Sequence, residues 1–429
     1  MSVPCKETAS HGFIRKKQFQ SMKKLAYIFS AMMFIASCSM GGLSEYDRYD
    51  GGYSKLSGEE VGDGGYDAAA AGDPSANGEG SGNTQAGRVT AGEWNDLDHW
   101  DYWAGLMTGK EFAQYSSYWK FWTNNRIAVE VKDNAGKPVA GVKVGLQRTG
   151  ADIWSAVTDN LGRAECWVGL FQQEDNVDAS AITLTINGKA WDTTPAVTSW
   201  DCPNGVALNK IVLENATPAA EKADIAFIVD ATGSMYDEIK FLKDDLMDIL
   251  KKVEAKQGGV AFRTGSVFYR DEGDVYVTRS SNFSDKFSTT IDFISKQEAD
   301  GGGDYPEAVH TALEKSIQDL SWDQSAKTKL AFILLDAPAH HFDNVISSLQ
   351  GTIKTYAASG IKVIPIAASG IDKSAEFMLR FFAAVTGGTY VFITNDSGVG
   401  GDHIAASVGE YQVEILNDLI IRLIEKYTN

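Results

Sequence analysis

The spacing of hydrophobic and polar residues changes along the chain, and the change predicts two folded regions of different class. Between about Arg126 and Glu214, apolar and polar residues alternate in short runs such as Ile127–Val131. Alternation over a few positions is typical of a half-buried β-strand. From Ala223 onward, short apolar runs alternate with longer segments whose apolar residues recur every three or four positions, as in amphipathic helices. The chain is therefore predicted to hold an all-β domain followed by an α/β domain.

Clusters of turn-forming residues divide the all-β region. Asp133–Pro138 and Thr158–Ala164 are rich in Asp, Asn and Gly, which favour turns. The segment Ile182–Ala190 predicts a hairpin with an Asn-Gly turn. These features predict a β-sandwich over residues 125–214, and residues 215–222 are expected to link it to the second domain.

The α/β region, residues 223–429, alternates predicted strands and helices. Strands are expected at Ile225–Val229, Val260–Tyr269, Val275–Val277, Leu330–Leu335, Ile361–Ile366 and Thr389–Ile393. Helices are expected at Tyr236–Lys252, Asp285–Lys296, Pro306–Leu320, Phe342–Ala358, Ser374–Val385 and Tyr411–Tyr427. This order predicts a doubly wound α/β fold.

The first 37 residues have the pattern of a secretory signal peptide. A short basic start, Met22–Lys24, precedes an apolar stretch from Leu25 to Ser37 that is too short to span a bilayer. Met22 is the simplest true start, because the residues before it are unusual in front of a signal. The stretch ends in Ile-Ala-Ser-Cys, which resembles a bacterial lipobox. This resemblance implies that Cys38 is lipidated and that acyl chains anchor the protein in the bacterial cell envelope.

Residues 38–91 are expected to form a disordered acidic tether. They are rich in Gly, Ser, Ala, Asn and acids, so they cannot bury enough apolar surface to offset the entropy of ordering. Ser39 is compatible with transit to the outer membrane, while the face that the protein occupies stays open. The formal net charge of −18 argues against nucleic acid as a partner.

Residues 92–124 are dense in aromatic side chains and hold half of the chain's 10 Trp residues. One interpretation is an exposed platform that binds sugar or peptide. The favoured interpretation is a cap packed against the next domain, since aromatic side chains bury large apolar areas. Exposure of these side chains distinguishes the two interpretations.

Two cysteines remain after the predicted start and the lipidation site are set aside. Cys166 and Cys202 both lie in the predicted sandwich. A disulfide between them is favoured in an exported protein, and two buried thiols are the alternative.

The candidate site begins with an acid and two hydroxyls at alternate positions. Asp230 directly follows the buried strand Ile225–Val229, and Thr232 and Ser234 follow it before the next helix. Ligands of open α/β sheets bind at the carboxyl ends of the strands. A carboxylate with two hydroxyls is an oxygen-only donor set, which suits a hard divalent cation such as Mg²⁺.

Two further segments accompany this motif in order along the chain. The loop Asp300–Glu307 contains three consecutive glycines, and Asp336 follows the apolar strand Leu330–Leu335. Together the three segments resemble the metal-ion-dependent adhesion site of von Willebrand factor type A domains. The resemblance covers Ala223 to the C-terminus and implies that Thr232 and Ser234 ligate the metal directly.

The resemblance further implies that Asp230 and Asp336 act through metal-bound water, and that Mg²⁺, Mn²⁺ or Ca²⁺ is the cofactor. In adhesion proteins of this family, a carboxylate of the partner completes the coordination. The second loop departs from the family pattern, because Asp304 stands where the usual ligand is Thr, with Asp300 as a rival. An additional acid makes the metal a weaker electrophile for a partner's carboxylate. The Gly-Gly-Gly-Asp loop resembles a branch found in hemicentin-like proteins, and the predicted sandwich resembles carboxypeptidase-regulatory-like or transthyretin-like modules.

Other residues with metal-binding or titratable side chains lie near the three segments in the sequence. His340 and His341 follow the third segment. Adjacent histidines cannot easily share one ion with an oxygen donor set, so both are expected at the rim of the site. Asp271, after Arg270, is expected to form a local ion pair, and His310 is expected on a helix surface.

These features predict an envelope lipoprotein that binds a divalent cation and, through it, a protein or cell-surface partner. A scaffold with a purely structural metal is the alternative. A metal-dependent hydrolase is disfavoured, because none of the three segments supplies a placed general base or a histidine ligand. The chain is therefore expected not to be an enzyme.

Overall fold

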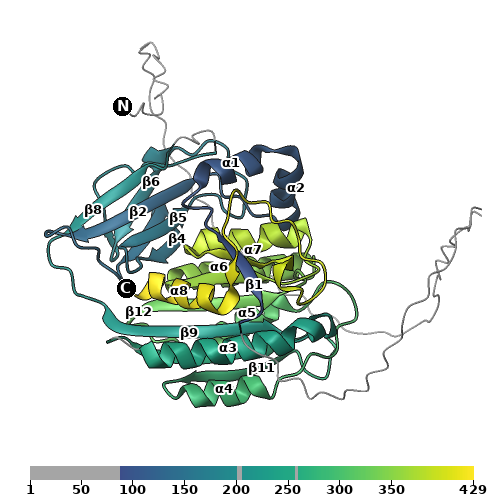
Figure 1. The fold of residues 1–429 in the computed structure, drawn as a ribbon. Coiled ribbons are helices and arrows are strands. Elements are labelled where there is room, and N and C mark those ends of the chain that lie inside the picture. The colour runs from purple at the N-terminus through teal and green to yellow at the C-terminus, as the bar shows by residue number, and fades with distance from the viewer. Residues whose placement is uncertain (1–86, 201–204, 257–258) are drawn as a thin grey trace, which may run out of the picture. The chain divides into compact units, whose positions relative to one another are not determined.

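A computed structural model describes residues 87–200, 205–256 and 259–429 (Figure 1). The predicted signal peptide, the lipidation site Cys38 and nearly all of the predicted tether lie outside these residues. An eight-stranded sheet forms the centre of the α/β region, in the order β11-β10-β9-β12-β13-β14-β1-β15. Its strands are β9 (Ala220–Asp230), β10 (Ala261–Tyr269), β11 (Thr278–Ser284), β12 (Ala326–Leu335), β13 (Ile361–Ala367), β14 (Tyr390–Ile393), β1 (Thr90–Trp94) and β15 (Glu414–Ile415).

Helices cover both faces of this sheet, so the predicted doubly wound α/β fold is confirmed. They are α3 (Tyr236–Lys256), α4 (Phe287–Ser295), α5 (Val309–Gln318), α6 (Asp343–Ala358), α7 (Lys373–Thr386) and α8 (Leu416–Thr428). Successive side chains of β9 alternate between the faces: Phe227 packs with α3, α4 and α8, whereas Ile228 packs with α5, α6 and α7. β9 pairs in parallel with both β10 and β12 and is buried on both faces, which explains its continuous apolar sequence.

Two expected elements of the α/β region differ from the structure. The strand expected at Val275–Val277 lies just downstream as β11, which pairs antiparallel with β10. The helix expected from Tyr411 begins only at Leu416. Glu414–Ile415 forms β15 instead, because its backbone pairs with β1.

The predicted end of the tether, residue 91, is wrong, because β1 begins before it. The strand starts at Thr90, inside the segment expected to be disordered, and the side chains of Val89 and Ala91 are buried. β1 pairs antiparallel with β14, with Trp94 opposite Tyr390, and with β15 on its other side. The α/β domain therefore includes a strand that precedes the sandwich, and the sandwich is an insertion between two strands of one sheet.

The aromatic segment forms two helices, α1 (Trp100–Thr108) and α2 (Lys110–Trp119), and its central side chains are buried. Trp103 stacks on Phe377 at a centroid distance of 6.2 Å, and Phe121 stacks on Phe381 at 4.2 Å. The cap interpretation is therefore confirmed over the exposed platform. The cap packs largely on α7 of the α/β domain, since both of these phenylalanines belong to that helix.

The sandwich consists of a three-stranded sheet, β5-β2-β8, and a four-stranded sheet, β4-β3-β6-β7. Its strands are β2 (Arg126–Asp133), β3 (Lys143–Arg148), β4 (Ala151–Val157), β5 (Arg163–Trp167), β6 (Ile182–Ile186), β7 (Lys189–Ala190) and β8 (Leu208–Leu213). Asn187 and Gly188, between β6 and β7, both have positive φ, as a type I′ turn requires. The predicted Asn-Gly hairpin is thus confirmed.

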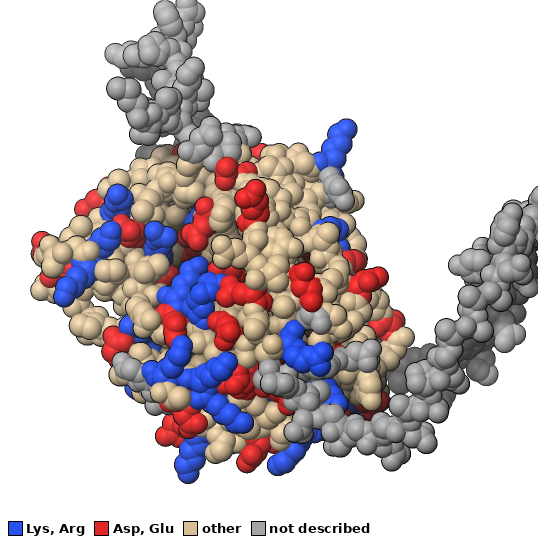
Figure 2. Space-filling model, in the orientation of Figure 1, with Lys and Arg blue, Asp and Glu red and all other residues tan. Residues whose placement is uncertain are grey.

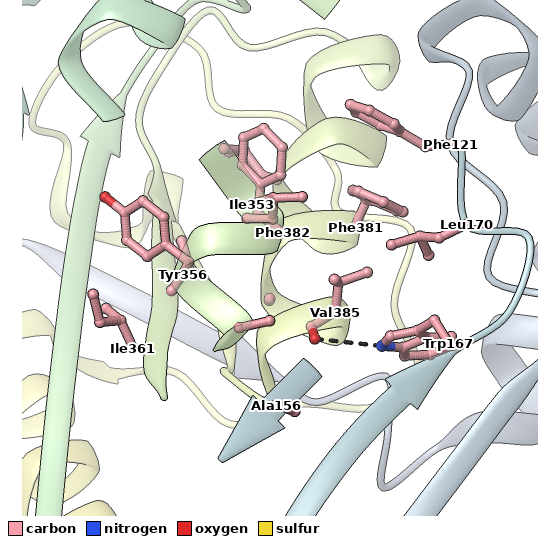
Figure 3. Close-up of a cluster of buried hydrophobic side chains, with 14 of the residues drawn as sticks. Phe121, Ala156, Trp167, Leu170, Ile353, Tyr356, Ile361, Phe381, Phe382 and Val385 are labelled. Atoms are coloured by element: carbon pink, nitrogen blue, oxygen red, sulfur yellow. Dashed lines mark hydrogen bonds between the residues drawn. The ribbon is translucent and has the colours of Figure 1, made fainter. Parts of the chain in front are cut away.

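The sandwich packs directly against the α/β domain (Figure 3). Trp167 of β5 donates a hydrogen bond from Nε1 to the carbonyl oxygen of Val385 at 3.3 Å, at the end of α7. Leu170 and Phe381 belong to the same buried hydrophobic cluster. The expected linker, residues 215–222, is shorter in the structure, because β9 already begins at Ala220. The two domains therefore share one continuous core.

Cys166 lies in this core as a free, buried thiol on β5. Burial raises the pKa of the thiol, and the nearby charge of Glu165 raises it further. Its predicted partner Cys202 lies outside the described residues, so the disulfide stays a prediction.

Charged side chains of both signs are interspersed on the face shown in Figure 2. Arg422 of α8 contacts Glu93 and Glu414, and Lys256 of α3 contacts Glu425. The negative net charge is therefore not gathered into one patch on this face. Among the described residues, none of the helices has the length and apolar character needed to cross a bilayer.

Candidate metal centre

The candidate site lies where β9, β10 and β12 end, in four neighbouring loops that we call the loop edge (residues 230–235, 270–274, 300–307 and 336–342). Backbone hydrogen bonds join the first and third of these loops. The amide of Gly233 donates to the carbonyl of Gly301 at 2.9 Å, and the amide of Asp300 donates to the carbonyl of Ala231 at 3.0 Å. A Cβ on Gly233 would lie 2.8 Å from the Gly301 oxygen, so this close approach requires glycine.

The first motif has the geometry that the sequence predicts. Asp230 is fully buried, and its Oδ1 accepts hydrogen bonds from the amide and the hydroxyl of Thr232 at 2.9 and 2.7 Å. The hydroxyl oxygens of Thr232 and Ser234 lie 3.1 Å apart. Asp230 thereby fixes Thr232, and the two hydroxyls converge on one place.

The third motif brings a second buried carboxylate to the same place. Burial and the charge of Asp336 raise the pKa of Asp230 to about 7, although the hydrogen bonds from Thr232 lower it. Burial likewise raises the pKa of Asp336 to about 6, and a hydrogen bond from Ser234 opposes this effect. Two acids are thus held close together where ionisation of both is unfavourable.

The donor set fits a hard divalent cation. Oδ2 of Asp230 and Oδ1 of Asp336 are buried without a hydrogen-bond partner, and buried oxygens of this kind normally have one. The buried hydroxyl of Tyr269 lies near Asp230 and lowers the pKa of this carboxyl. No Lys or Arg in the described part of the chain forms an ion pair with either acid. Carboxylate and hydroxyl oxygens are the donors that Mg²⁺ prefers. A divalent cation would satisfy these oxygens and neutralise the acids.

Glu307 is a site residue that the sequence analysis missed. It is buried, its Oε2 has no hydrogen-bond partner, and burial together with the charges of Asp230 and Asp271 raises its pKa to about 9. A Cβ on Gly302 would lie 3.2 Å from Cβ of Thr232 and 3.0 Å from Oε1 of Glu307, so Gly302 separates these two side chains.

The burial of Glu307 has a long-range cause. From the sequence, a Glu next to a predicted helix start is expected to be exposed, where its negative charge interacts favourably with the helix dipole. Here α5 begins only at Val309, and the amide of Glu307 instead donates to the carbonyl of Pro338 at 2.9 Å. The Pro-Glu pair within a glycine-rich loop was the available signal, but the contact with the third loop depends on the folded sheet.

Asp304 and Asp300, the two candidate metal ligands in the glycine loop, have different neighbours in the structure. Asp304 is exposed, and a carboxylate oxygen of Asp304 lies within 4.8 Å of ligand atoms of Asp271 and His340. Asp300 lies 3.4 Å from Arg270. The structure therefore brings Asp230, Thr232, Ser234 and Asp336 together, and ligation of the same ion by Asp304 stays a prediction.

The two histidines lie at the rim of the loop edge, as expected. Nε2 of His340 is 2.7 Å from Oδ1 of Asp271, so the partner of Asp271 lies 69 residues further along the chain and the expected local ion pair is wrong. His341 stacks on Tyr118 with a centroid distance of 3.6 Å. His310 is only partly exposed, and its Nε2 lies 3.8 Å from Glu272.

Exposed aromatic side chains accompany the loop edge. Tyr236 directly follows the first loop, and Tyr305 and Phe342 lie in the third and fourth loops. Their exposed fractions are 71%, 43% and 60%. Tyr118, the partner of His341, is 44% exposed. We call these four residues the aromatic rim.

The comparisons with known proteins agree with this geometry. Residues 224–376 match the family model of the von Willebrand factor A domain. An ariadne-like RING finger protein of Acanthamoeba polyphaga mimivirus is 30% identical over 186 residues, which are 40% of this chain and 18% of that protein. The alpha-protein kinase vwkA of Dictyostelium discoideum is 33% identical over 127 residues, which are 29% of this chain and 20% of the kinase. The chain thus spans about a fifth of the length of these relatives.

A solved structure is also similar to part of this chain. Proximal thread matrix protein 1 from the mussel byssus, with a zinc-occupied metal-ion-dependent adhesion site, is 18% identical, with a TM-score of 0.32. The match covers 39% of this chain and 40% of the mussel protein. The matching family model, the doubly wound sheet and the three metal-type loops lead to one conclusion: the α/β region of this chain is a von Willebrand factor A domain.

Proposed function

We propose that this protein is a cation-dependent binding protein: its A domain holds a divalent cation such as Mg²⁺ and, through it, binds a protein or cell-surface partner. The observation that carries the proposal is the pair of buried carboxylate oxygens without partners, Asp230 Oδ2 and Asp336 Oδ1, beside the hydroxyls of Thr232 and Ser234. A cation at this place would resolve the cost of burying both acids.

The residues around the cation have different tasks. Thr232 and Ser234 present hydroxyl oxygens, and Asp230 holds Thr232 in place through two hydrogen bonds. Asp336 supplies charge from the loop that follows β12, with Ser234 as its hydrogen-bond donor. When bound, the cation would supply a positive centre for an anionic group of the partner.

The aromatic rim supports partner binding over a purely structural metal. Large apolar side chains that stay exposed next to polar loops are common at interaction sites. A partner that offers a carboxylate flanked by apolar side chains would contact both the cation and residues such as Phe342. The aromatic segment 92–124 contributes Tyr118 to this surface, whereas its tryptophans Trp103 and Trp119 are buried.

The cellular setting belongs to the same proposal. The signal-peptide pattern and the lipobox-like Ile-Ala-Ser-Cys sequence support a bacterial lipoprotein, anchored through Cys38 in the cell envelope, with the outer membrane favoured. A non-enzymatic role is proposed as well, since the residues that meet at Asp230 and Asp336 are donors for a cation rather than a nucleophile with its base.

Calorimetric titration of the protein with Mg²⁺ and Mn²⁺ tests the cation. We expect binding in the wild type, no detectable binding for Asp230→Ala, and unchanged binding for Asp292→Ala, which removes an exposed acid on α4. Absence of binding in the wild type would refute the metal mechanism.

A probe peptide tests the partner chemistry. We expect a short peptide with one Glu between two Phe residues to bind in the presence of Mg²⁺ and to be released by a chelator. Cation binding without any cation-dependent peptide binding would instead favour a scaffold in which the metal is structural.

A further inference from the structure

We infer that Asp271, Asp304 and His340 form a second cation site, next to the first, which takes a transition-metal ion of the Zn²⁺ class. The inference does not rest on the proposed function, since it involves none of the residues Asp230, Thr232, Ser234 and Asp336. It assigns Asp304, the ligand that the sequence predicts for the first ion, to the second site instead.

The three side chains converge from three different loops of the loop edge. Asp271 follows β10, Asp304 lies in the glycine loop and His340 follows β12. Their ligand atoms all lie within 4.8 Å of one another. Donors of a tetrahedral Zn²⁺, with bonds of about 2.0–2.2 Å, are separated by about 3.4 Å. Small side-chain rotations would therefore bring the three donors around one ion.

The pair of Asp271 and His340 is arranged as two ligands that share a proton. Their 2.7 Å contact joins a carboxylate oxygen to Nε2 of the imidazole. A cation would replace this proton and move the two atoms apart by less than about 1 Å to reach the ligand spacing of zinc. The imidazole plane is held by Phe342, which stacks on it at 5.8 Å and 11°.

Asp274 links the loop that carries Asp271 to the loop that carries Asp304. Its Oδ2 accepts hydrogen bonds from the amide of Asp271 at 3.1 Å and from the amide of Gly302 at 2.9 Å. The two carboxylate ligands are thus held by the same anchor, which limits the rearrangement that a cation would require.

A buried acid beside the triad gives an independent indication. Glu307 is 2% exposed and its Oε2 has no hydrogen-bond partner. Its backbone forms an isolated parallel bridge with Ala339, next to His340, and Asp271 is among the acids whose charges act on it. A buried carboxyl oxygen without a partner therefore lies next to the strand end that carries His340.

The donor types distinguish the two sites. The first site offers only oxygen, which favours Mg²⁺. The triad adds an imidazole nitrogen, which suits Zn²⁺ and similar transition ions. Three protein ligands leave a further coordination position to water or to a partner, and Asp304 is exposed to solvent.

Titration of the full chain with Zn²⁺, and with Co²⁺ as a spectroscopic probe of coordination, tests the inference. We expect two classes of site. His340→Ala should weaken Zn²⁺ binding by more than about tenfold, since the loss of an outer-shell partner alone typically costs about 10–100-fold. His341→Ala is the matched control: the adjacent histidine stacks on Tyr118 outside the triad and should leave Zn²⁺ binding unchanged.

Two more variants distinguish the two sites and control for misfolding. Asp304→Ala changes an exposed side chain and should lower Zn²⁺ affinity as His340→Ala does, with an unchanged circular dichroism spectrum. Asp230→Ala should abolish Mg²⁺ binding and remove one of the two classes of Co²⁺ site, while the spectrum of the class that depends on His340 persists. The inference is overturned if His340→Ala and His341→Ala behave alike, or if Asp230→Ala removes both ions.

Discussion

Two groups of buried acids, one beneath the aromatic cap and one at the loop edge, differ in what neutralises them. Beneath the cap, Asp96 and Glu376 surround the fully buried Arg380, whose Nε lies 2.9 Å from Oδ2 of Asp96. Although burial lowers the pKa of Arg380, the charge of Asp96 raises it above its ordinary value. At the loop edge, neither Asp230 nor Asp336 forms an ion pair with a Lys or Arg of the described residues.

This difference indicates the role of each group of buried acids. A buried acid without a partner is costly, and a fold that only needs stability supplies a cation from its own chain, as Arg380 does. The unneutralised acids at the loop edge are consistent with a cation taken from solution. The comparison can be tested by removing the internal cation, by adding the external one, and by removing one acid.

The largest effect is expected for removal of the internal cation. Arg380→Met leaves Asp96 buried without its counter-charge, while Glu376 keeps its ion pair with Lys373, and the change should lower the free energy of unfolding by about 3–5 kcal/mol. Arg422→Met is the matched control, since Arg422 also contacts two acids but is 44% exposed, and its loss should cost at most about 1 kcal/mol. Chemical denaturation measures both. Equal losses would mean that burial does not distinguish the two arginines.

The next largest effect concerns pH and the external cation. The folded protein holds the pKa of Asp230 at about 7 and of Asp336 at about 6, above the ordinary carboxylate range. Stability from the protonated acids is present below pH ~4 and is lost as the pH rises through about 7. The melting temperature of the metal-free protein should therefore fall between pH 5 and pH 8, by roughly 5 °C.

Added Mg²⁺ should reverse this loss. At pH 8, a concentration of about 100 times the dissociation constant adds about 2.7 kcal/mol of stability. At pH 5, where protons compete for the same oxygens, the gain should be smaller. A gain independent of pH would indicate that the cation binds elsewhere.

A smaller effect of opposite sign is expected for the isosteric variant Asp230→Asn. The amide retains an oxygen to accept from Thr232 and removes the repulsion with Asp336, so the metal-free protein at pH 8 should gain about 1–2 kcal/mol. The same variant should lose the stabilisation by Mg²⁺. Calorimetric melting with and without Mg²⁺ measures both effects, and a destabilised metal-free variant would show that Asp230 has a structural role.

The smallest effect on stability is expected at the aromatic rim. Phe342→Ser changes a side chain that is 60% exposed and should alter the free energy of unfolding by less than about 0.5 kcal/mol. Binding of the Glu-containing probe peptide should nevertheless weaken. Phe381→Ser, in the shared core, should instead cost about 3 kcal/mol or more. Unchanged peptide binding in Phe342→Ser would exclude this residue from the partner surface.

Local sequence patterns were sufficient to predict the central elements of the fold. The apolar run of β9 and the helical periodicity of α3 were predicted within a few residues, because each depends on nearby residues only. β1 was missed because Thr90–Trp94 is short and finds its partner, β14, only in the folded sheet. The late start of α8 has the same origin, since β15 exists only through its pairing with β1.

In the candidate site, too, contacts within one loop could be predicted and contacts between loops could not. The first motif could be predicted because Asp230, Thr232 and Ser234 are close in the sequence and contact one another. The neighbours of Asp304 could not be predicted, because Asp271 and His340 reach it from two other loops. Sequence spacing therefore defines donors within one loop, while the assignment of donors to an ion depends on how the loops meet.

The insertion of the sandwich between β1 and β9 has a consequence for the order in which the chain folds during synthesis. All strands of the sandwich lie within residues 126–213, so this domain can complete its sheets while the rest of the chain is still being made. β1 leaves the ribosome before the sandwich, yet its partner β14 follows about 300 residues later. The first strand of the A domain must therefore remain unpaired until β14 or β15 has been made.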